Sequence, residues 1–268
     1  MTLFHLFLVA TIQGLTEFLP VSSSGHLVLL PELSGMADQG QVIDVAVHVG
    51  SLFAVILYFR ADVAITLAGF GRLFRGKVDT PGAFFALCLS IATVPVILCG
   101  AALHALSLTE ALRNIEVIGW TMLGFGLVLY WADQRGETAR TAESWTLKDA
   151  AIMGLWQALA LIPGTSRSGI TITGGRFLGY GRDAAARLAM VMSIPTIIAS
   201  GFLLGGEVAF KADAALAKDG AIAGLFAFLS ALLALHLMMR LLQTVSFTPY
   251  VVYRVCLGVV LLVIAYTA

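Results

Sequence analysis

Side chains with the chemistry of group transfer are gathered in one short segment near the start of the chain, QGLTEFLPVSSSGH at positions 13–26. They are a carboxylate, three hydroxyl groups and an imidazole, from Glu17, Ser22, Ser23, Ser24 and His26. Such a set can supply the nucleophile and the base of phosphoryl or acyl transfer. The segment lies within an otherwise apolar run at positions 3–30, where polar and ionisable groups are costly and therefore indicate a functional site.

Helix-interrupting residues accompany these polar groups. Gly14, Pro20 and Gly25 fall in the same segment, and Gln13 and Glu17 are four residues apart, so they share one face of a helical arm. Broken backbone inside a membrane is tolerated only where it is buried in protein or lines a cavity. The sequence therefore predicts an interrupted helical hairpin whose polar residues face the protein interior.

A second segment repeats this pattern 144 residues later, QALALIPGTSRSG at positions 157–169. In both segments a Gln is followed by an apolar run, a Pro and a hydroxyl cluster that a Gly closes 12 residues after the Gln. The polar residues of the second cluster are Thr165, Ser166, Arg167 and Ser168. Paired interrupted segments in the two halves of a chain point to a site between inverted repeats at the middle of the membrane.

Arg167 gives the second segment an affinity for anions. A guanidinium group binds two oxygens at once, and the flanking Gly164 and Gly169 allow backbone N–H groups to turn toward a phosphate. An unpaired arginine at this depth is costly. We therefore expect either an anionic ligand or Glu17 to pair with it.

Each of these groups also has a purely structural interpretation. Ser and Thr in membrane helices commonly bond to neighbouring helices or to their own backbone, and a single buried histidine, such as His5, His104 or His236, is usually an ordinary core residue. The structural interpretation must explain every costly polar group of the two segments independently. The combined set therefore favours a functional site.

The composition predicts a polytopic helical membrane protein. Of 268 residues, 59% are hydrophobic and 12% are charged, and the mean hydropathy is +0.93, whereas about a quarter of the residues of soluble proteins are charged. The formal net charge is zero and no basic stripe occurs, so no nucleic-acid partner is expected. Cys88, Cys99 and Cys256 lie in apolar segments without a CxxC motif and are expected to be buried, inert thiols.

Six apolar stretches are long enough to span a membrane, at about 43–59, 84–104, 114–132, 188–206, 221–241 and 250–267. Positions 3–30 and 151–179 are the two interrupted segments, and Pro31–Gln41 is expected to be a loop. The fold class expected is an all-α membrane protein with six transmembrane helices and two opposed re-entrant hairpins. It would form one integral membrane domain, 1–268, with inverted repeats at about 1–132 and 133–268.

Basic residues predict the orientation. If the connection 60–82 is cytoplasmic, thirteen Lys and Arg residues lie on the cytoplasmic side and three on the outer side. The first hairpin then enters from outside and the second from the cytoplasm, so their tips can meet. The Met1–His5 start has no Lys or Arg, and no cleavable signal peptide is expected.

Two further sites flank the main motifs. Asp44 and His48 are four residues apart at the start of the first full span, so the carboxylate could orient or charge the imidazole near the outer mouth of the site. A simple interfacial pair is an equally good interpretation. Arg254, just inside the last span, is expected to be an interfacial anchor.

The two motifs, QGLTEFLPVSSSGH at 13–26 and PGTSRSG at 163–169, together with Asp44/His48 and Tyr253-Arg254-Val, resemble the undecaprenyl-diphosphatase family (BacA/UppP) over essentially the whole chain. The resemblance implies a bacterial inner-membrane enzyme that hydrolyses undecaprenyl diphosphate to undecaprenyl phosphate, recycles the lipid carrier of peptidoglycan synthesis and confers bacitracin resistance. It also implies a divalent metal cation, Mg²⁺ or Ca²⁺, in an active-site crevice on the periplasmic side. The family has Glu or Gln at its first motif position. Here it is Gln13, which places more of the metal-binding role on Glu17.

The expected site follows from the motifs and the resemblance together. Four residues are assigned to catalysis, with Glu17 also holding the metal: Glu17, Ser23, His26 and Arg167. Eight are assigned to substrate binding: Gln13, Ser22, Ser24, Gly25, Thr165, Ser166, Ser168 and Gly169. Asp44 and His48 support them. Ser23 as nucleophile with His26 as its base is favoured over attack by His26 itself.

Two other classes of membrane protein are alternatives. A PAP2-type lipid phosphatase needs a histidine several residues after its downstream arginine, but none follows Arg167 until His236. A transporter or flippase for a lipid phosphate is the stronger rival, because opposed re-entrant loops are typical of transporters. The expected partners are a polyprenyl diphosphate substrate and membrane lipids, and a homodimer is left open.

Overall fold

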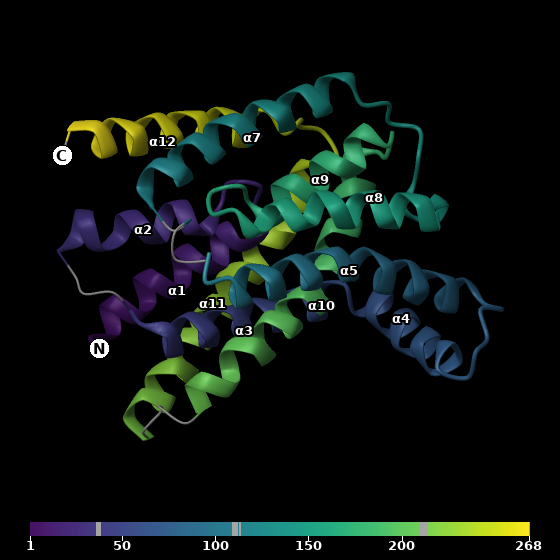
Figure 1. The fold of residues 1–268 in the computed structure, drawn as a ribbon, viewed down its shortest axis with the longest axis horizontal. Helices are drawn as coiled ribbons and strands as arrows, with labels where there is room; N and C mark the ends of the chain where they lie inside the picture. Colours follow the sequence, from purple (N-terminus) through teal and green to yellow (C-terminus); the bar gives the residue numbers. More distant parts are fainter. Residues whose placement is uncertain (36–38, 109–111, 113, 210–213, 268) are drawn as a thin grey trace.

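The computed structural model of the chain is helical and describes residues 1–35, 39–108, 112, 114–209 and 214–267 (Figure 1). In the first half of the chain the helices are α1 (Leu3–Phe18), α2 (Ser23–Ser34), α3 (Gln41–Tyr58), α4 (Arg60–Leu73), α5 (Pro81–Ala105) and α7 (Ile115–Arg135). In the second half they are α8 (Leu147–Ala158), α9 (Arg167–Phe177), α10 (Arg182–Ala209), α11 (Ala214–Leu241) and α12 (Thr248–Thr267), with the short 3-10 helices Ala142–Ser144 and Leu159–Leu161.

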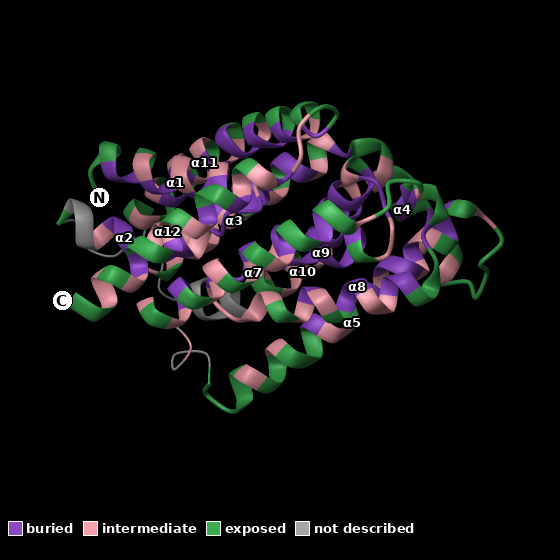
Figure 2. Ribbon diagram, turned by 90° about the horizontal axis from the view of Figure 1, so that it is seen from above, coloured by how far each residue is buried: buried purple, intermediate pink, exposed green. Residues whose placement is uncertain are grey.

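Six of the described helices are long and apolar enough to cross a membrane: α3, α5, α7, α10, α11 and α12. They coincide with the six predicted spans and confirm a polytopic helical membrane protein. Large apolar side chains such as Leu98, Leu229 and Val263 are exposed, as expected for surfaces that face lipid tails, and exposed residues recur along the helices in Figure 2. Cys99 and Cys256 are exposed as well, so the prediction that they are buried is wrong, and only Cys88 is buried.

Three boundaries differ from the prediction. The loop expected at Pro31–Gln41 begins later, because α2 continues to Ser34 and ends on Gly35 in the left-handed conformation (φ 66°). The connection 60–82 contains α4, which packs on α5. Helix α11 begins at Ala214 rather than 221. Two of the three basic residues counted on the outer side, Arg113 and Lys211, lie outside the described residues.

Both interrupted segments are broken helices, as predicted. Helix α1 ends at Phe18 and α2 begins at Ser23, while residues 162–166 separate the second 3-10 helix from α9. Ser22 and Ser166, which are 144 positions apart, both have positive φ angles, 74° and 68°, directly before the second helix of each pair. A non-glycine residue in this conformation is uncommon and marks a sharply turned backbone.

The two broken helices are clamped in comparable ways. Helix α1 packs on α11 and α8 packs on α5, while α12 lies along α7 (Figure 1). The contacts of α1 with α11 and of α8 with α5 both need glycine: a Cβ added to Gly14 would lie 2.5 Å from the carbonyl oxygen of Ala227, and one added to Gly154 would lie 2.5 Å from that of Ala92. The close backbone contact therefore fixes the first helix of each broken pair against a long apolar helix.

Polar contacts hold the start of α8, the first helix of the second broken pair. Arg140 ion-pairs with Asp149, and the carboxylate also accepts hydrogen bonds from Thr146 and Tyr180. Burial would raise the pKa of Asp149, but the hydrogen bonds from Arg140, Thr146 and Tyr180 outweigh it and lower that pKa. The first residues of α8 are therefore anchored by a charged carboxylate.

A fully buried ion pair closes the end of α9. Arg176 lies 3.3 Å from Asp133 and donates hydrogen bonds to the carbonyl oxygens of Asp133, Gly136, Glu137 and Tyr180, and Asp133 also pairs with Arg182 at 2.7 Å. Both side chains of the inner pair have no exposed surface. A buried charge that loses its partner is strongly destabilising.

We expect Asp133→Asn to lower the stability of the folded protein by about 3–5 kcal/mol, because it leaves Arg176 buried without its counter-charge. Thermal unfolding of the purified protein in detergent measures this. The matched control is Asp79→Asn in the exposed Arg72–Asp79 pair, for which no clear change in the unfolding temperature is expected. Equal shifts for the two variants would contradict the structural role of the buried pair.

Candidate active site

The tips of the two broken helices touch. The backbone N–H of Gly164 donates to Ser24 Oγ at 3.1 Å, and Ser168 Oγ donates to the carbonyl oxygen of Leu19 at 3.0 Å. Thr121 of α7 donates to the carbonyl oxygen of Pro163 at 2.6 Å and so fixes the second turn. The predicted meeting of the two hydroxyl clusters is therefore found in the structure.

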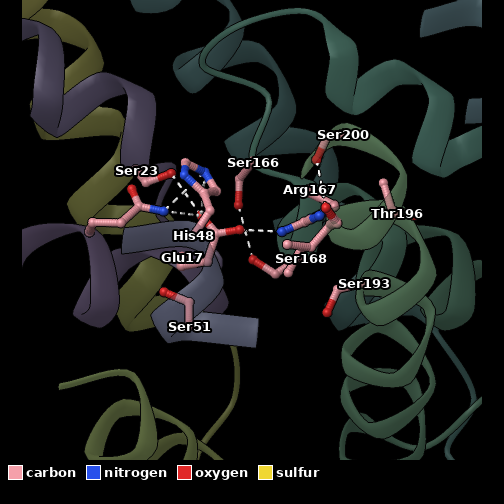
Figure 3. Close-up of polar contacts among 12 residues, drawn as sticks. Glu17, Ser23, His48, Ser51, Ser166, Arg167, Ser168, Ser193, Thr196 and Ser200 are labelled. Carbon is pink, nitrogen blue, oxygen red and sulfur yellow. Dashed lines mark hydrogen bonds and ion pairs between the residues drawn. The ribbon is translucent and has the colours of Figure 1, made fainter. Parts of the chain in front are cut away.

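A buried ion pair joins the two turns. Arg167 Nη2 contacts Glu17 Oε1, across 150 positions of sequence, and Figure 3 shows the two side chains pointing toward one another. Of the two partners expected for Arg167, an anionic ligand or Glu17, the structure contains the pair with Glu17. Because the pair lies in a largely desolvated place, it is a strong and directional contact that holds the two motifs in one site.

The second oxygen of Glu17 contacts two other residues of the first motif, Gln13 and Ser23. Its Oε2 accepts hydrogen bonds from Gln13 Nε2 at 2.7 Å and from Ser23 Oγ at 3.2 Å, and His48 Nε2 lies 3.8 Å away (Figure 3). The carboxylate is therefore in direct contact with the Ser23 hydroxyl.

His48 is oriented by the backbone of its own helix. Its Nδ1–H donates to the carbonyl oxygen of Asp44 at 2.7 Å, which leaves Nε2 to accept from Gln13 Nε2 at 3.2 Å. The carboxylate of Asp44 instead accepts from Gln39 at 2.8 Å. His48 thus belongs to the site, as expected, and the carboxylate contact that the spacing suggested is replaced by a bond to the Asp44 backbone.

His26 and Ser23 have different hydrogen-bond partners. Its Nδ1–H donates to the carbonyl oxygen of Ser22 at 2.7 Å, and its Nε2 accepts from the hydroxyl of Tyr253 at 2.7 Å. The two rings are also stacked, with centroids 5.5 Å apart. Among the described residues, the partner of Ser23 is Glu17 and the partner of His26 is Tyr253 on α12.

Other predicted binding residues line the turns or pack behind them. Ser22 and Ser24 hydroxyls lie 3.0 Å apart, and Ser166 Oγ accepts from the Gly169 N–H at 3.2 Å and lies 3.2 Å from Ser168 Oγ. Gly25 has a packing role, because a Cβ there would lie 2.4 Å from the sulfur of Met122. Thr165 is fully buried and its hydroxyl has no hydrogen-bond partner.

Arg254 is not the interfacial anchor that its position in the sequence suggested. It has no exposed surface, and its Nη2 donates to the carbonyl oxygens of Gly164 and Thr165 at 3.2 Å and 2.9 Å. The guanidinium therefore lies behind the second turn. Tyr253 and Arg254, adjacent on α12, each contact a different one of the two turns.

The oxygen atoms around Glu17 suit a hard divalent cation. Gln13 Oε1 is buried without a hydrogen-bond partner, next to the carboxylate that Gln13 Nε2 contacts. Mg²⁺ and Ca²⁺ prefer carboxylate and carbonyl oxygens, and Mg²⁺ commonly uses few protein ligands together with substrate phosphates. No cluster of three or more His, Cys, Asp or Glu occurs in the part of the chain that the structure describes, so a cation here would depend on oxygens of the substrate.

Comparison with known proteins gives one consistent result. The family model described as "Bacitracin resistance protein BacA" matches residues 6–260. The chain is 76% identical to an undecaprenyl-diphosphatase of Dinoroseobacter shibae and 69% identical to one of Roseobacter denitrificans, each over all of both chains. It is 45% identical to an undecaprenyl-diphosphatase of Hahella chejuensis, again over the full length of both.

Proposed function

The chain belongs to the BacA family of bacitracin resistance proteins, and we propose that it hydrolyses undecaprenyl diphosphate to undecaprenyl phosphate and inorganic phosphate at the site between the two turns. The observation that carries this assignment is the contact of Glu17 with both Arg167 and Ser23. It brings a hydroxyl, a carboxylate and a guanidinium within one small group, which supports their roles as nucleophile, base and phosphate-binding group. In the cell, this reaction recycles the lipid carrier of peptidoglycan synthesis.

The reaction proceeds in two displacements. Ser23 Oγ attacks the terminal phosphorus, the bond from that phosphorus to the bridging oxygen breaks, and Glu17 Oε2 takes the hydroxyl proton. Glu17 passes this proton to the departing undecaprenyl phosphate and is again a carboxylate. Water then attacks the phosphoserine, gives a proton to Glu17, and orthophosphate leaves as Ser23 regains a proton from Glu17. The 3.2 Å hydrogen bond between Ser23 and Glu17 supports this assignment of the base.

Charge neutralisation and positioning supply most of the catalysis in phosphoryl transfer. Arg167 can turn from Glu17 to the phosphate oxygens, and the first turn of α9 adds backbone N–H groups and the positive end of a helix dipole. Glu17 and Gln13 Oε1 would hold the divalent cation, Mg²⁺ or Ca²⁺, which supplies further positive charge to the diphosphate when bound.

We expect the trapped intermediate to be an acid-stable phosphoserine at Ser23. Brief reaction with substrate labelled at the terminal phosphate, acid quenching and peptide mapping identify the labelled residue. His26 serves as a positioning residue in this mechanism, since both of its ring nitrogens are engaged by Ser22 and Tyr253. An acid-labile phosphohistidine at His26 would overturn the assignment of the nucleophile.

An open apolar cavity lies on α3, the helix that carries His48. A cavity of about 690 Å³ lies between α3 and α11, and Val45, Val49 and Phe53 form part of its α3 wall. His48, which contacts Gln13, lies on the same helix between these residues. An apolar cavity on the helix that carries a site residue fits the polyprenyl tail of the substrate, so we assign the tail to it.

Filling this cavity should affect long substrates more than short ones. We expect Ala221→Trp to lower kcat/KM for undecaprenyl diphosphate by about 10-fold, because it removes apolar contact area. Hydrolysis of a short prenyl diphosphate should change less than about 3-fold, since a short chain occupies less of the cavity. Steady-state phosphate release measures kcat/KM for both substrates. Equal losses of kcat/KM for the two would show that the tail does not bind in this cavity.

The membrane arrangement follows as a second part of the proposal. The two broken helices are opposed re-entrant hairpins in inverted repeats of about 1–132 and 133–268 within one domain, with the crevice open on the periplasmic side. The matched φ angles of Ser22 and Ser166 and the parallel contacts of α1 with α11 and of α8 with α5 support it. Cysteine labelling from the outer side tests it: Ser24→Cys should react in intact spheroplasts, and a cysteine placed at Arg75 should not.

Phosphate release from undecaprenyl diphosphate by the purified protein in detergent tests the function. Wild-type protein should release orthophosphate, and EDTA should abolish release until Mg²⁺ or Ca²⁺ is restored. Activity that is indifferent to EDTA would remove the cation from the proposal and leave the hydrolysis. No release with any divalent cation would contradict the enzyme and favour a transporter of lipid phosphate.

A further inference from the structure

Arg254 is a buried cation without a counter-charge beside the candidate active site. It lies on α12, has no exposed surface, and is seven residues into a helix apolar enough to span the membrane. Its Nε and Nη1 have no hydrogen-bond partner within the described part of the chain. No carboxylate of the described residues forms an ion pair with it, in contrast to Arg167 and Arg176, which pair with Glu17 and Asp133.

The guanidinium is directed at the turn that precedes α9. Nη2 donates to the carbonyl oxygens of Gly164 and Thr165, and a Cβ added to Gly169 would lie 2.8 Å from Nη1. The unpartnered hydroxyl of Thr165 lies in the same turn. Glycine at position 169 therefore leaves room for the guanidinium under the first turn of α9, where the helix dipole is also positive.

The charges of the site explain why such a group is retained. Glu17 and Arg167 neutralise each other, so Arg254 and the α9 dipole are the positive charges of this turn that no described carboxylate offsets. A lipid diphosphate carries more than one negative charge at neutral pH. In surroundings of low dielectric constant, a buried cation acts on a nearby anion with little screening.

We propose that Arg254 is a positioning residue that holds the 164–169 turn from behind and makes it selective for the more highly charged phosphate ligand. It acts through the turn and not by direct contact with the substrate. This inference rests on the proposed function, since it assumes that the turn binds the diphosphate. Arg254 thus determines both the conformation of the second motif and its excess positive charge.

Ligand binding separates this role from a merely structural one. The probes are a hydrolysis-resistant prenyl bisphosphonate, a prenyl monophosphate and orthophosphate, with Kd measured by calorimetry in detergent. We expect Arg254→Gln, which keeps a donor and removes the charge, to weaken binding of the bisphosphonate by about 10- to 100-fold. Binding of the monophosphate should weaken by less than about 5-fold, since this ligand carries less charge. Arg254→Lys should keep most of the preference because it keeps the charge.

Two further variants keep the test decisive. Gly169→Ala should displace the Arg254 guanidinium and so reduce the preference for the bisphosphonate over the monophosphate. This variant tests the proposal if Arg254→Gln does not fold. Arg176→Gln is the control, a buried arginine at the other end of α9, and should lower the unfolding temperature without changing the ratio of affinities. The Kd of orthophosphate, which has no prenyl chain, shows whether the effect of the charge depends on that chain.

The outcomes are distinct from those of the function assay. If wild-type protein hydrolyses undecaprenyl diphosphate and folded Arg254→Gln keeps the wild-type ratio of bisphosphonate to monophosphate affinity, the proposal for Arg254 is wrong and the proposed function stands. Equal losses in the Lys and Gln variants would also overturn it, because shape and not charge would then decide. Failure of the wild type to bind or hydrolyse any prenyl diphosphate contradicts the proposed function itself.

Discussion

Glu17→Gln is expected to lower kcat/KM for phosphate release by about 1000-fold or more, because one carboxylate accepts the Ser23 proton, pairs with Arg167 and would hold the cation. Glutamine has nearly the same shape but neither the charge nor the basicity. The fall should be mainly in kcat, since the lost interactions concern the transition state. Steady-state phosphate release with detergent-solubilised undecaprenyl diphosphate measures both parameters.

The control for this variant is Glu116→Gln, an exposed carboxylate in the first turn of α7, which should keep wild-type activity. Elution as a single folded species and an unfolding temperature close to that of wild type would show that Glu17→Gln is inactive in its folded form. A folded Glu17→Gln variant that retains more than about a tenth of the activity would exclude Glu17 as the base.

Arg167→Lys is expected to lower kcat/KM by about 100-fold or more, although the charge is kept. The guanidinium can bind two phosphate oxygens in one plane, and it reaches Glu17 across the junction of the two turns. An ammonium group is a single point charge and cannot make both contacts. The same phosphate-release assay measures the effect.

The matched control is Arg135→Lys at the exposed end of α7, where less than about a twofold change is expected. Near-wild-type turnover by a folded Arg167→Lys protein would mean that positive charge alone is sufficient, and the bidentate contact with phosphate would have to be abandoned.

The interrupted helices and their polar contents could be predicted because the membrane makes each polar group costly. Glu17 and Arg167 stand out from long apolar runs, and the repeat of Gln, hydroxyl and Gly residues at an offset of 144, with a Pro before each hydroxyl cluster, marks the two turns as a pair. Charge predicts either Glu17 or an anionic ligand as the partner of Arg167, and the structure contains the pair with Glu17.

The partners of Ser23 and His26 could not be predicted from spacing. The two residues are three positions apart, which suggests a Ser–His contact, but the turn at Ser22 directs Ser23 toward Glu17 and leaves His26 facing α12. Tyr253 is 227 positions from His26. Only the packing of α12 and α2 against α7 brings the two together.

Arg254 was misjudged because a span expected to begin at 250 places it near the interface. Helix α12 begins at Thr248, and the turn at Gly164–Thr165 covers the guanidinium. The reasoning applied to Glu17, that an ionisable group inside an apolar helix is functional by default, would have singled it out. Helix α4 was missed for a different reason: Arg60, Asp62 and Arg72 interrupt its apolar pattern.

The central claim is that the two turns form one catalytic unit joined by Glu17 and Arg167. A double-mutant cycle on kcat/KM for undecaprenyl diphosphate, with Glu17→Gln, Arg167→Gln and the double variant, tests it most directly. Because residues that act as a unit have non-additive effects, we expect the double variant to be within about 3-fold of the slower single variant. Losses that multiply in the double variant would show that the two residues act independently, and would contradict the single site.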